Sequence, residues 1–205
     1  MERFTSLSGV AAPLLEDDVN TDQITPLYRD LHPDFAALLF SRRRWREHGS
    51  VDPEFVLNRP AFRSAKILFT GANFGCGSSR ESAVWGMLAF GIRCIIARSF
   101  ADTYRENCLK NGLLPVTIDG SEADRLEHLV VELDGREPLT VDLNSQQIIA
   151  RDAVFAFTIS SSERHALLEG LDDIGLSLEH RSAIEAFEEA QGSAQPWLQR
   201  AAVQR

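Results

Sequence analysis

Apolar and polar positions along the middle of the chain form blocks that predict strands and helices in turn. Short apolar runs at 66–70, 93–100 and 113–119 are typical of buried strands. Between them, residues 78–91 and 101–112 carry apolar side chains at helical spacing, and a glycine closes each segment. This β–α–β–α–β order predicts an α/β fold with parallel strands joined by crossover helices.

The flanking segments extend this pattern on both sides. Residues 9–15 predict a strand, and 34–47 predict a helix that ends in a group of arginines. Residues 126–160, which include the apolar run "LVVELDG" and the turn pair "DG", predict an all-β stretch. Two further helices are expected over 162–171 and 179–190.

Size and composition indicate one soluble domain. The chain has 205 residues, of which 44% are hydrophobic, enough for one core but too few for two full-sized domains. We therefore expect a single domain over 1–190, followed by a polar tail over 191–205. No apolar window is long enough to span a bilayer, and no targeting segment is apparent, so we expect a cytoplasmic protein.

Charge and cysteine content narrow the classes of function. A net charge of −9 argues against binding to nucleic acid or to an anionic membrane. One basic cluster at 41–48 holds four arginines, and it predicts a solvated helix face or a contact between subunits, or else a contribution to anionic-substrate binding. The three cysteines, Cys76, Cys94 and Cys108, are widely spaced, so neither a disulfide framework nor a metal site built by this chain alone is expected.

The stretch "GANFGCGSSRES" at 71–82 is the strongest candidate for chemistry. It lacks the lysine of a P-loop, and its glycines are spaced wrongly for a dinucleotide fold or a hydrolase elbow. Cys76 before a helix start resembles a thiol nucleophile, but none of the five histidines has a context that marks it as a base. A small, half-buried loop cysteine is the favoured interpretation.

The serines of this stretch allow two interpretations. Ser78 and Glu81 have the spacing of a capping box at the start of the helix over 78–91. A glycine-rich loop before a helix also exposes backbone N–H groups at the positive end of the helix dipole. Arg80 adds a charge whose fork matches a carboxylate. Such a site can hold a carboxylic acid, while a serine alkoxide takes a proton from the adjacent carbon.

Several motifs together resemble one known family. "NFGCGSSRE", "IIARSF" and "NCLKNGLLPV", with "NTDQI" before them and "RHALLEGLDDIGLSL" after, strongly resemble the small subunit of 3-isopropylmalate dehydratase, in the aconitase superfamily. The motifs occur in the same order as in the family, and the resemblance covers about residues 5–190. The late "GLDDIGL" is similar to the isopropylmalate type and unlike the fused aconitases.

The resemblance implies a fold, a reaction and a partner. The fold is the three-layer β/β/α swivelling domain of the superfamily, which closes over a large subunit. That partner carries a [4Fe–4S] cluster whose open iron binds the substrate, so no cofactor or metal is expected on this chain. The reaction is that of a hydro-lyase, active only with the large subunit, which interconverts 2-isopropylmalate and 3-isopropylmalate by dehydration and rehydration in leucine biosynthesis.

The resemblance also assigns roles to individual residues. Ser78 matches the family's catalytic serine, which takes the proton as an alkoxide. Ser79 and Arg80 match contacts to the substrate carboxylate. Asp22, in "NTDQI", matches an active-site aspartate, and Thr21 beside it is expected to bind substrate. Without the family, Asp22 would be interpreted as a turn residue.

Three departures from the family pattern bear on the substrate. Asn20 replaces an aspartate, Ser82 replaces a histidine, and Thr25 occupies a position where an apolar residue is common. We expect Ser82 to face away from the site, so that the chemistry survives. Thr25 and Arg29 lie in the segment 25–30, where the family sets side-chain specificity, and are expected to contact substrate.

These departures leave two alternatives to an isopropylmalate enzyme. Polar groups near the pocket could favour a smaller or more polar malate, such as 2-methylmalate/citraconate. The first alternative is therefore the small subunit of a paralogous hydro-lyase that acts on citraconate/2-methylmalate or dimethylmaleate. A non-catalytic swivel domain that binds a carboxylate or a partner is the alternative from another class. The retained serines, arginine and aspartate argue against a loss of turnover.

Overall fold

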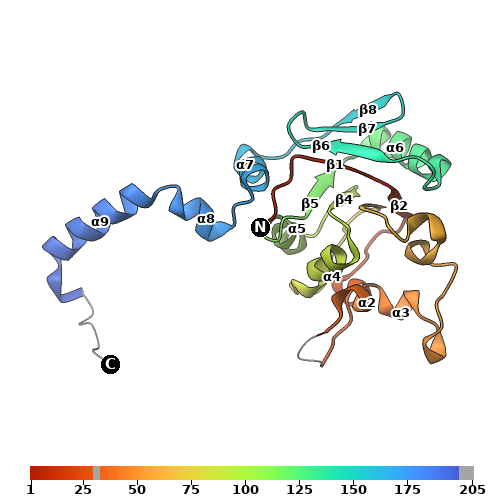
Figure 1. Ribbon diagram of the computed structural model, residues 1–205, viewed down its shortest axis with the longest axis horizontal. Helices are drawn as coiled ribbons and strands as arrows, with labels where there is room; N and C mark the ends of the chain where they lie inside the picture. Colours follow the sequence, from red (N-terminus) through yellow and green to blue (C-terminus); the bar gives the residue numbers. More distant parts are fainter. Residues whose placement is uncertain (30–32, 199–205) are drawn as a thin grey trace.

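The computed structural model describes residues 1–29 and 33–198, which form two sheets, their covering helices and a projecting helical arm (Figure 1). The first sheet has four parallel strands in the order β2-β3-β4-β5. Its strands are β2 (Ala11–Leu14), β3 (Ile67–Thr70), β4 (Cys94–Ala97) and β5 (Leu114–Thr117). The predicted parallel strands and crossover connections are confirmed.

The second sheet has four antiparallel strands in the order β1-β6-β7-β8. Its strands are β1 (Ser6–Gly9), β6 (Leu139–Asp142), β7 (Gln147–Ala150) and β8 (Ala153–Ala156). The strand predicted over 9–15 is confirmed as β2, whereas β1, which ends at Gly9 and belongs to the other sheet, was not predicted. The chain crosses between the sheets at Val10, whose carbonyl accepts hydrogen bonds from the amides of Lys66 and Ile67.

Side chains alternate between the two faces of the parallel sheet, which creates three layers. On β3, Ile67 and Phe69 point into an apolar cluster shared with the antiparallel sheet, whereas Leu68 points into a second cluster beneath the helices. On β4, Ile96 points into the cluster shared with the antiparallel sheet, and Ile95 points into the cluster beneath the helices. Burial on both faces explains why these strands are continuous apolar runs in the sequence. The expected β/β/α layering is confirmed.

The helical layer is built from α4 (Ser82–Phe90) and α5 (Asp102–Lys110). Gly91 ends α4 in the left-handed conformation, with φ of 109°, as its position in the sequence predicted. The start of α4 differs from the prediction, because the helix begins at Ser82 and its N-cap residue Glu81 makes no side-chain capping bond. The capping box predicted for Ser78 and Glu81 is thus wrong, and Ser78 lies in the loop before the helix.

The helix α6 (Gly120–Leu133) corrects the prediction for the segment that follows β5. The run "LVVELDG", expected to be a strand, forms the last turns of this helix and the turn after it. Its buried residues Ala123, Leu126, Val130 and Leu133 recur at spacings of three and four, and they pack into the cluster between the sheets.

The helix predicted over 34–47 is instead two short helices, α2 (Phe35–Leu38) and α3 (Ser41–Arg44). Phe40 breaks the helix with a left-handed φ of 48° and is completely buried. Its amide donates to the carbonyl of Ile24 over 2.7 Å, at the end of α1 (Thr21–Ile24). Three short 3-10 turns follow, η1 (Glu47–Gly49), η2 (Val56–Asn58) and η3 (Pro60–Phe62).

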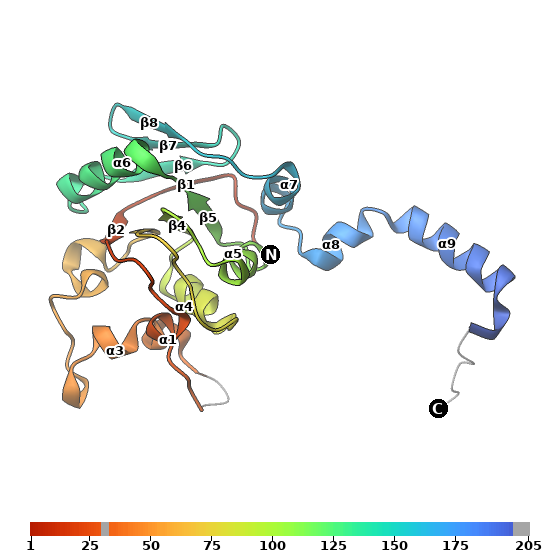
Figure 2. The ribbon, with the colours of Figure 1, turned by 180° about the vertical axis from the view of Figure 1, so that it is seen from behind.

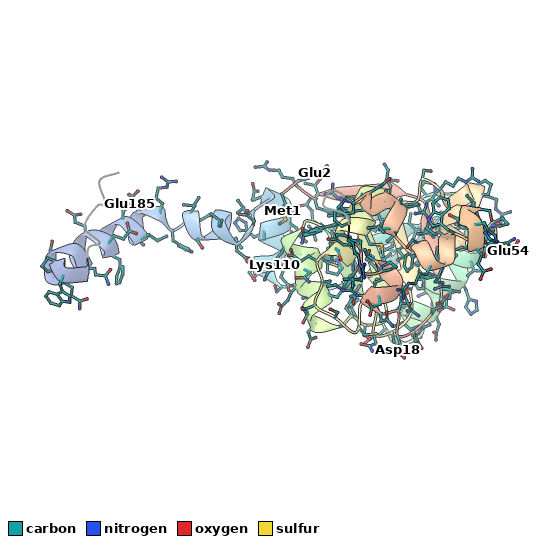
Figure 3. The ribbon with its side chains drawn as sticks, turned by 90° about the horizontal axis from the view of Figure 1, so that it is seen from below. Met1, Glu2, Asp18, Glu54, Lys110 and Glu185 are labelled. Atoms are coloured by element: carbon teal, nitrogen blue, oxygen red, sulfur yellow. The ribbon has the colours of Figure 1, made fainter. Side chains whose placement is uncertain are left out.

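The C-terminal helices leave the body of the protein as an arm. After α7 (Ser161–Glu169), α8 (Asp173–Leu178) and α9 (Arg181–Ala194) extend away from both sheets, and η4 (Pro196–Leu198) follows (Figure 2). Neither α8 nor α9 has a buried residue, and the side chains along α9, Glu185 among them, point into solvent (Figure 3). The predicted tail from 191 begins inside α9, and residues 199–205 lie outside the described structure.

Candidate active site

Two loops lie side by side at the carboxyl ends of the parallel strands β2 and β3, which is where ligands bind in sheets of this kind. One loop leads from β2 to α1, and the other is the glycine-rich stretch after β3. The amide of Gly75 donates to the carbonyl of Val19 over 2.8 Å, and the amide of Thr21 donates to that of Cys76 over 2.9 Å. These bonds join segments that are more than 50 residues apart in the sequence.

The glycines of the second loop permit this close approach. Gly75 has a φ of 79°, and a Cβ atom there would lie 2.1 Å from Cγ of Tyr104 on α5. A Cβ atom on Gly71 would lie 2.5 Å from the carbonyl oxygen of Glu16 in the first loop. The loop therefore packs against α5 on one side and against the first loop on the other. Tyr104 is buried, and this burial raises the pKa of its hydroxyl.

Asp22 lies on the short helix α1, whose start is fixed by its own capping box. The Asn20 side chain accepts from the amide of Gln23, and the Gln23 side chain accepts from the amide of Asn20, both over 2.9 Å. Asn20 thus performs a capping role that an aspartate also performs in proteins. Asp22 is exposed, and its carboxylate forms an ion pair with Nη2 of Arg80.

Ser78 and Ser79 are both exposed in the loop between Gly77 and α4. Among the described residues, no hydrogen-bond partner is found for the Ser78 hydroxyl, nor any acceptor for the amides of Ser79, Arg80 and Glu81. Nε of Arg80 is buried and also has no partner in this part of the chain. The arrangement gathers unpaired donors and a cation beside a free hydroxyl, as the binding of a carboxylate requires.

The structure brings some of the predicted site residues together and separates others. Asp22, Arg80 and the two serines occupy one exposed face at the meeting point of the loops. Arg29 is exposed on the segment after α1, and no polar contact within residues 1–29 and 33–198 joins it to this face. Asp30, the last residue of the predicted specificity segment, lies outside the described residues.

Two of the predicted substrate contacts have buried side chains. Thr25 is completely buried, and its hydroxyl donates to the carbonyl of Ser82 over 3.2 Å. Thr21 is 1% exposed, and its hydroxyl is bonded to the backbone of Ser78. These positions give no support to a direct contact with substrate for either threonine. Ser82 is buried, in agreement with the expectation that it faces away from the site.

Asn107 is a neighbour of the site that the sequence did not single out. It lies on α5, is 8% exposed, and donates from Nδ2 to the carbonyl of Ser79 over 3.2 Å. A signal was present, because Asn107 begins the motif "NCLKNGLLPV" and is a polar residue on the inward face of a predicted helix. A buried side-chain amide in such a position needs a hydrogen-bond partner, and a nearby loop supplies one.

The cysteines do not form a metal site. Cys94 and Cys108 are buried, and this burial raises the pKa of both thiols. Cys76 is half-buried, and its Sγ contacts the carbonyl of Asp18 over 3.4 Å. Within residues 1–29 and 33–198, no group of three or more histidine, cysteine or acidic side chains is placed to hold a metal ion. The described chain therefore does not fit an iron–sulfur cluster.

The arginine cluster at 41–48 lies over a groove of about 1120 Å³ that does not include Ser78. Arg43 pairs with Glu16 through two hydrogen bonds of 2.7 and 2.6 Å, and Arg46 pairs with Asp52. Arg44 donates to the backbone carbonyls of Ala36 and Leu39 and to Asn58. These internal bonds favour a structural role for the cluster over a contribution to anion binding.

No helix in the described part of the chain combines the length and the apolar character needed to cross a membrane.

Comparison with known families covers most of the chain. Residues 1–121 match the family described as the aconitase C-terminal domain. Residues 173–201 match the family described as the C-terminal domain of the 3-isopropylmalate dehydratase small subunit.

Full-length relatives carry one name. The chain is 48% identical over 202 residues to the 3-isopropylmalate dehydratase small subunit of Xanthobacter autotrophicus, covering 97% of this chain and all of the relative. It is 46% identical over 203 residues to the protein of the same name from Agrobacterium fabrum, covering 96% of this chain and all of that one.

A solved structure shares the fold. A 3-isopropylmalate dehydratase from Methanocaldococcus jannaschii aligns with a TM-score of 0.63 and 23% identity, over 89% of this chain and 99% of that one.

Proposed function

Because the chain belongs to the family of 3-isopropylmalate dehydratase small subunits, in the aconitase superfamily, we propose that it is one half of an isopropylmalate isomerase. Joined to a large subunit in the cytoplasm, it interconverts 2-isopropylmalate and 3-isopropylmalate, as a hydro-lyase of leucine biosynthesis. The observation that carries the proposal is the Ser78 hydroxyl beside Arg80 and backbone amides, for which the described residues offer no hydrogen-bond partner, at a loop that the family's own motif forms.

Ser78 acts as the base in this proposal. Its hydroxyl is exposed and has no hydrogen-bond partner within the described residues, so it is available to a substrate. As an alkoxide, it takes a proton from the carbon next to a carboxylate, and the hydroxyl group leaves the neighbouring carbon as hydroxide to give an unsaturated acid. Rehydration in the opposite sense returns the proton from Ser78 and places the hydroxyl on the other carbon. The unpaired amides nearby stabilise the negative charge.

Arg80 and Ser79 bind a substrate carboxylate. The ion pair with Asp22 uses only Nη2 of Arg80, which leaves Nη1 for a ligand. The Ser79 hydroxyl lies beside it on the same exposed loop. Asp22 is the second catalytic residue that we propose, a carboxylate that can accept a hydrogen bond from the hydroxyl group of the substrate.

The openness of the site supports a requirement for a partner. Ser78, Ser79 and Asp22 are all exposed, and none of them lines the arginine-cluster groove. Proton abstraction from carbon needs a site that excludes water and strengthens electrostatic contacts. A second protein surface must therefore close over this face, which agrees with the name "small subunit" of the relatives. We place the [4Fe–4S] cluster on that partner, where it would supply the Lewis acid for the departing hydroxyl.

The test is turnover by the chain co-purified without oxygen with its large subunit. The unsaturated acid is followed by ultraviolet absorbance while 2-isopropylmalate, 3-isopropylmalate and citraconate are offered in parallel. We expect the two isopropylmalates to be the best substrates, judged by kcat/KM. A preference for citraconate would overturn the substrate assignment. No turnover on any of the three, with the cluster intact, would overturn the proposal as a whole.

A further inference from the structure

Two buried side chains hold the backbone on either side of the Ser78 hydroxyl. We propose that Thr21 and Asn107 are positioning residues, which reach the Ser78–Ser79 segment from different helices and fix the direction in which Ser78 presents its oxygen. This inference rests on the proposed role of Ser78 as the base. Thr21 then positions the base and does not bind substrate. Asn107, to which the sequence assigned no role, also positions the base.

Thr21 holds the Ser78 end of the segment through its hydroxyl group, which acts both as a donor and as an acceptor. Its Oγ1 donates to the carbonyl of Ser78 over 3.0 Å and accepts from the amide of Ser78 over 3.1 Å. The residue is 1% exposed, so the hydroxyl is not open to a ligand. Its own amide donates to the carbonyl of Cys76 over 2.9 Å, which fixes Thr21 against the same loop. The Thr21 side chain thus fixes both the N–H and the C=O group of Ser78, the residue proposed as the base.

Asn107 holds the Ser79 end of the segment from α5. Its Nδ2 donates to the carbonyl of Ser79 over 3.2 Å. The backbone carbonyl of Asn107 accepts from Nδ2 of Asn111 over 2.9 Å, and Oδ1 of Asn111 accepts from Nε1 of Trp85 on α4 over 3.1 Å. These two bonds connect the end of α5, the helix that carries Asn107, to α4.

The segment needs such support because nothing regular holds it. Ser78 and Ser79 lie outside any helix or strand, and both side chains are exposed. Within residues 1–29 and 33–198, Thr21 and Asn107 provide all the side-chain hydrogen bonds to the Ser78–Ser79 backbone. A displacement of about 1 Å at a reacting group can cost about 100-fold in rate. We expect the loss of either contact to move the Ser78 hydroxyl out of its reactive position.

The experiment uses substitutions that differ by one hydroxyl. Thr21→Val removes the hydroxyl at constant shape, and Thr21→Ser keeps it. Thr70→Val is the matched control, because Thr70 is equally buried and its hydroxyl also donates to a backbone carbonyl, that of Glu16 over 3.3 Å. The Glu16 carbonyl keeps a second donor, the amide of Gly71, after that change. Each variant is co-purified with the large subunit, and kcat, KM and Tm are measured with 2-isopropylmalate.

We expect Thr21→Val to lower kcat by about 100-fold, with a much smaller change in KM, because the base and not the binding contact is displaced. Thr21→Ser should restore most of the kcat, and Thr70→Val should keep it. A Thr21→Val complex with the kcat of the Thr70→Val complex would overturn the inference. So would a Thr21→Ser complex as slow as Thr21→Val, since the hydroxyl would then be irrelevant.

A second variant decides the matter if Thr21→Val fails to fold. Asn107→Asp keeps the shape of the side chain but loses the N–H donor to Ser79, and it too should lower kcat more than KM. Wild-type kcat in Asn107→Asp would contradict the role of this residue. Ser78→Ala is measured beside these variants, so that a failure of the proposed base can be told apart from a failure of the positioning role of Thr21 and Asn107. If Ser78→Ala keeps turnover, the proposed base is wrong. If only Ser78→Ala is slow, the base stands and the positioning inference fails.

Discussion

Substitution of Gly75 by alanine should destabilise the protein through a contact that can be isolated by a matched control. Gly75 has a φ of 79°, and its new Cβ would lie 2.1 Å from Cγ of Tyr104. Gly49 has nearly the same φ, 78°, but a Cβ there would meet nothing within 4 Å. Both substitutions therefore place an alanine in a strained left-handed conformation. Only the substitution at Gly75 also pushes a Cβ atom into the buried ring of Tyr104.

The magnitude follows from two contributions. A left-handed conformation costs a non-glycine residue about 1–2 kcal/mol, and the reduced freedom of the unfolded chain offsets about 0.4–1 kcal/mol of it. Overpacking a filled site adds about 1–3 kcal/mol. We therefore expect a loss of about 3 kcal/mol for Gly75→Ala and about 1 kcal/mol for Gly49→Ala. In a chain of this length, these losses lower Tm by about 6–12 °C and about 2–4 °C.

The assay is thermal unfolding of the isolated chain, followed by circular dichroism, with urea unfolding as a check on the free energies. The difference in Tm between the two variants measures the contact of the loop with Tyr104. Equal shifts at Gly75 and Gly49 would refute the reasoning, because the loop would then not be held against α5.

Three further predictions concern the rest of the molecule. Arg105 donates two hydrogen bonds to the carboxylate of Glu163, and these lower the pKa of Glu163 from 4.5 to about 2. The pair therefore stabilises the fold fully above about pH 4.5, and this stabilisation is lost as the pH falls through about 2. The Tm gap between wild type and Glu163→Gln should therefore shrink between pH 6 and pH 3, and a constant gap would contradict this. Removal of residues 181–205 should change Tm by no more than about 1 °C, because α9 buries no residue, and a loss of several degrees would show that it packs on the body. Arg80→Lys should raise KM by about tenfold through loss of a charged hydrogen bond, and an unchanged KM would leave Arg80 a structural role.

The parts of the fold that local pattern determines were predictable from the sequence. The parallel strands β3, β4 and β5 are continuous apolar runs because both faces of the sheet are buried, and Gly91 ends α4 where its lack of a side chain allows. In α6, the β-branched residues Val130 and Val131 suggested a strand, although the spacing of the buried positions from Ala123 to Leu133 already had a helical period. In this segment the helical period of the buried positions, and not the β propensity of the valines, determines the element.

Other features depend on contacts that no local pattern contains. The break at Phe40 arises because its amide bonds to Ile24, from a different helix. The loop before α4 stays open at Ser78 because Thr21, 57 residues earlier, takes both polar groups of its backbone. The residue types of the site were predictable, through the family's motif, but the burial of Thr25 and the contact from Asn107 become visible only in three dimensions.

The central claim is that the exposed hydroxyl of Ser78 is the base, and one measurement tests it most directly. The kcat of the Ser78→Ala complex is compared with that of the wild-type complex on 2-isopropylmalate, at equal cluster content. We expect a loss of about 10²–10⁴-fold in kcat. Tm and assembly should be unchanged, since the Ser78 side chain makes no hydrogen bond among the described residues and lies before α4. A Ser78→Ala complex that turns over at the wild-type rate would contradict the account.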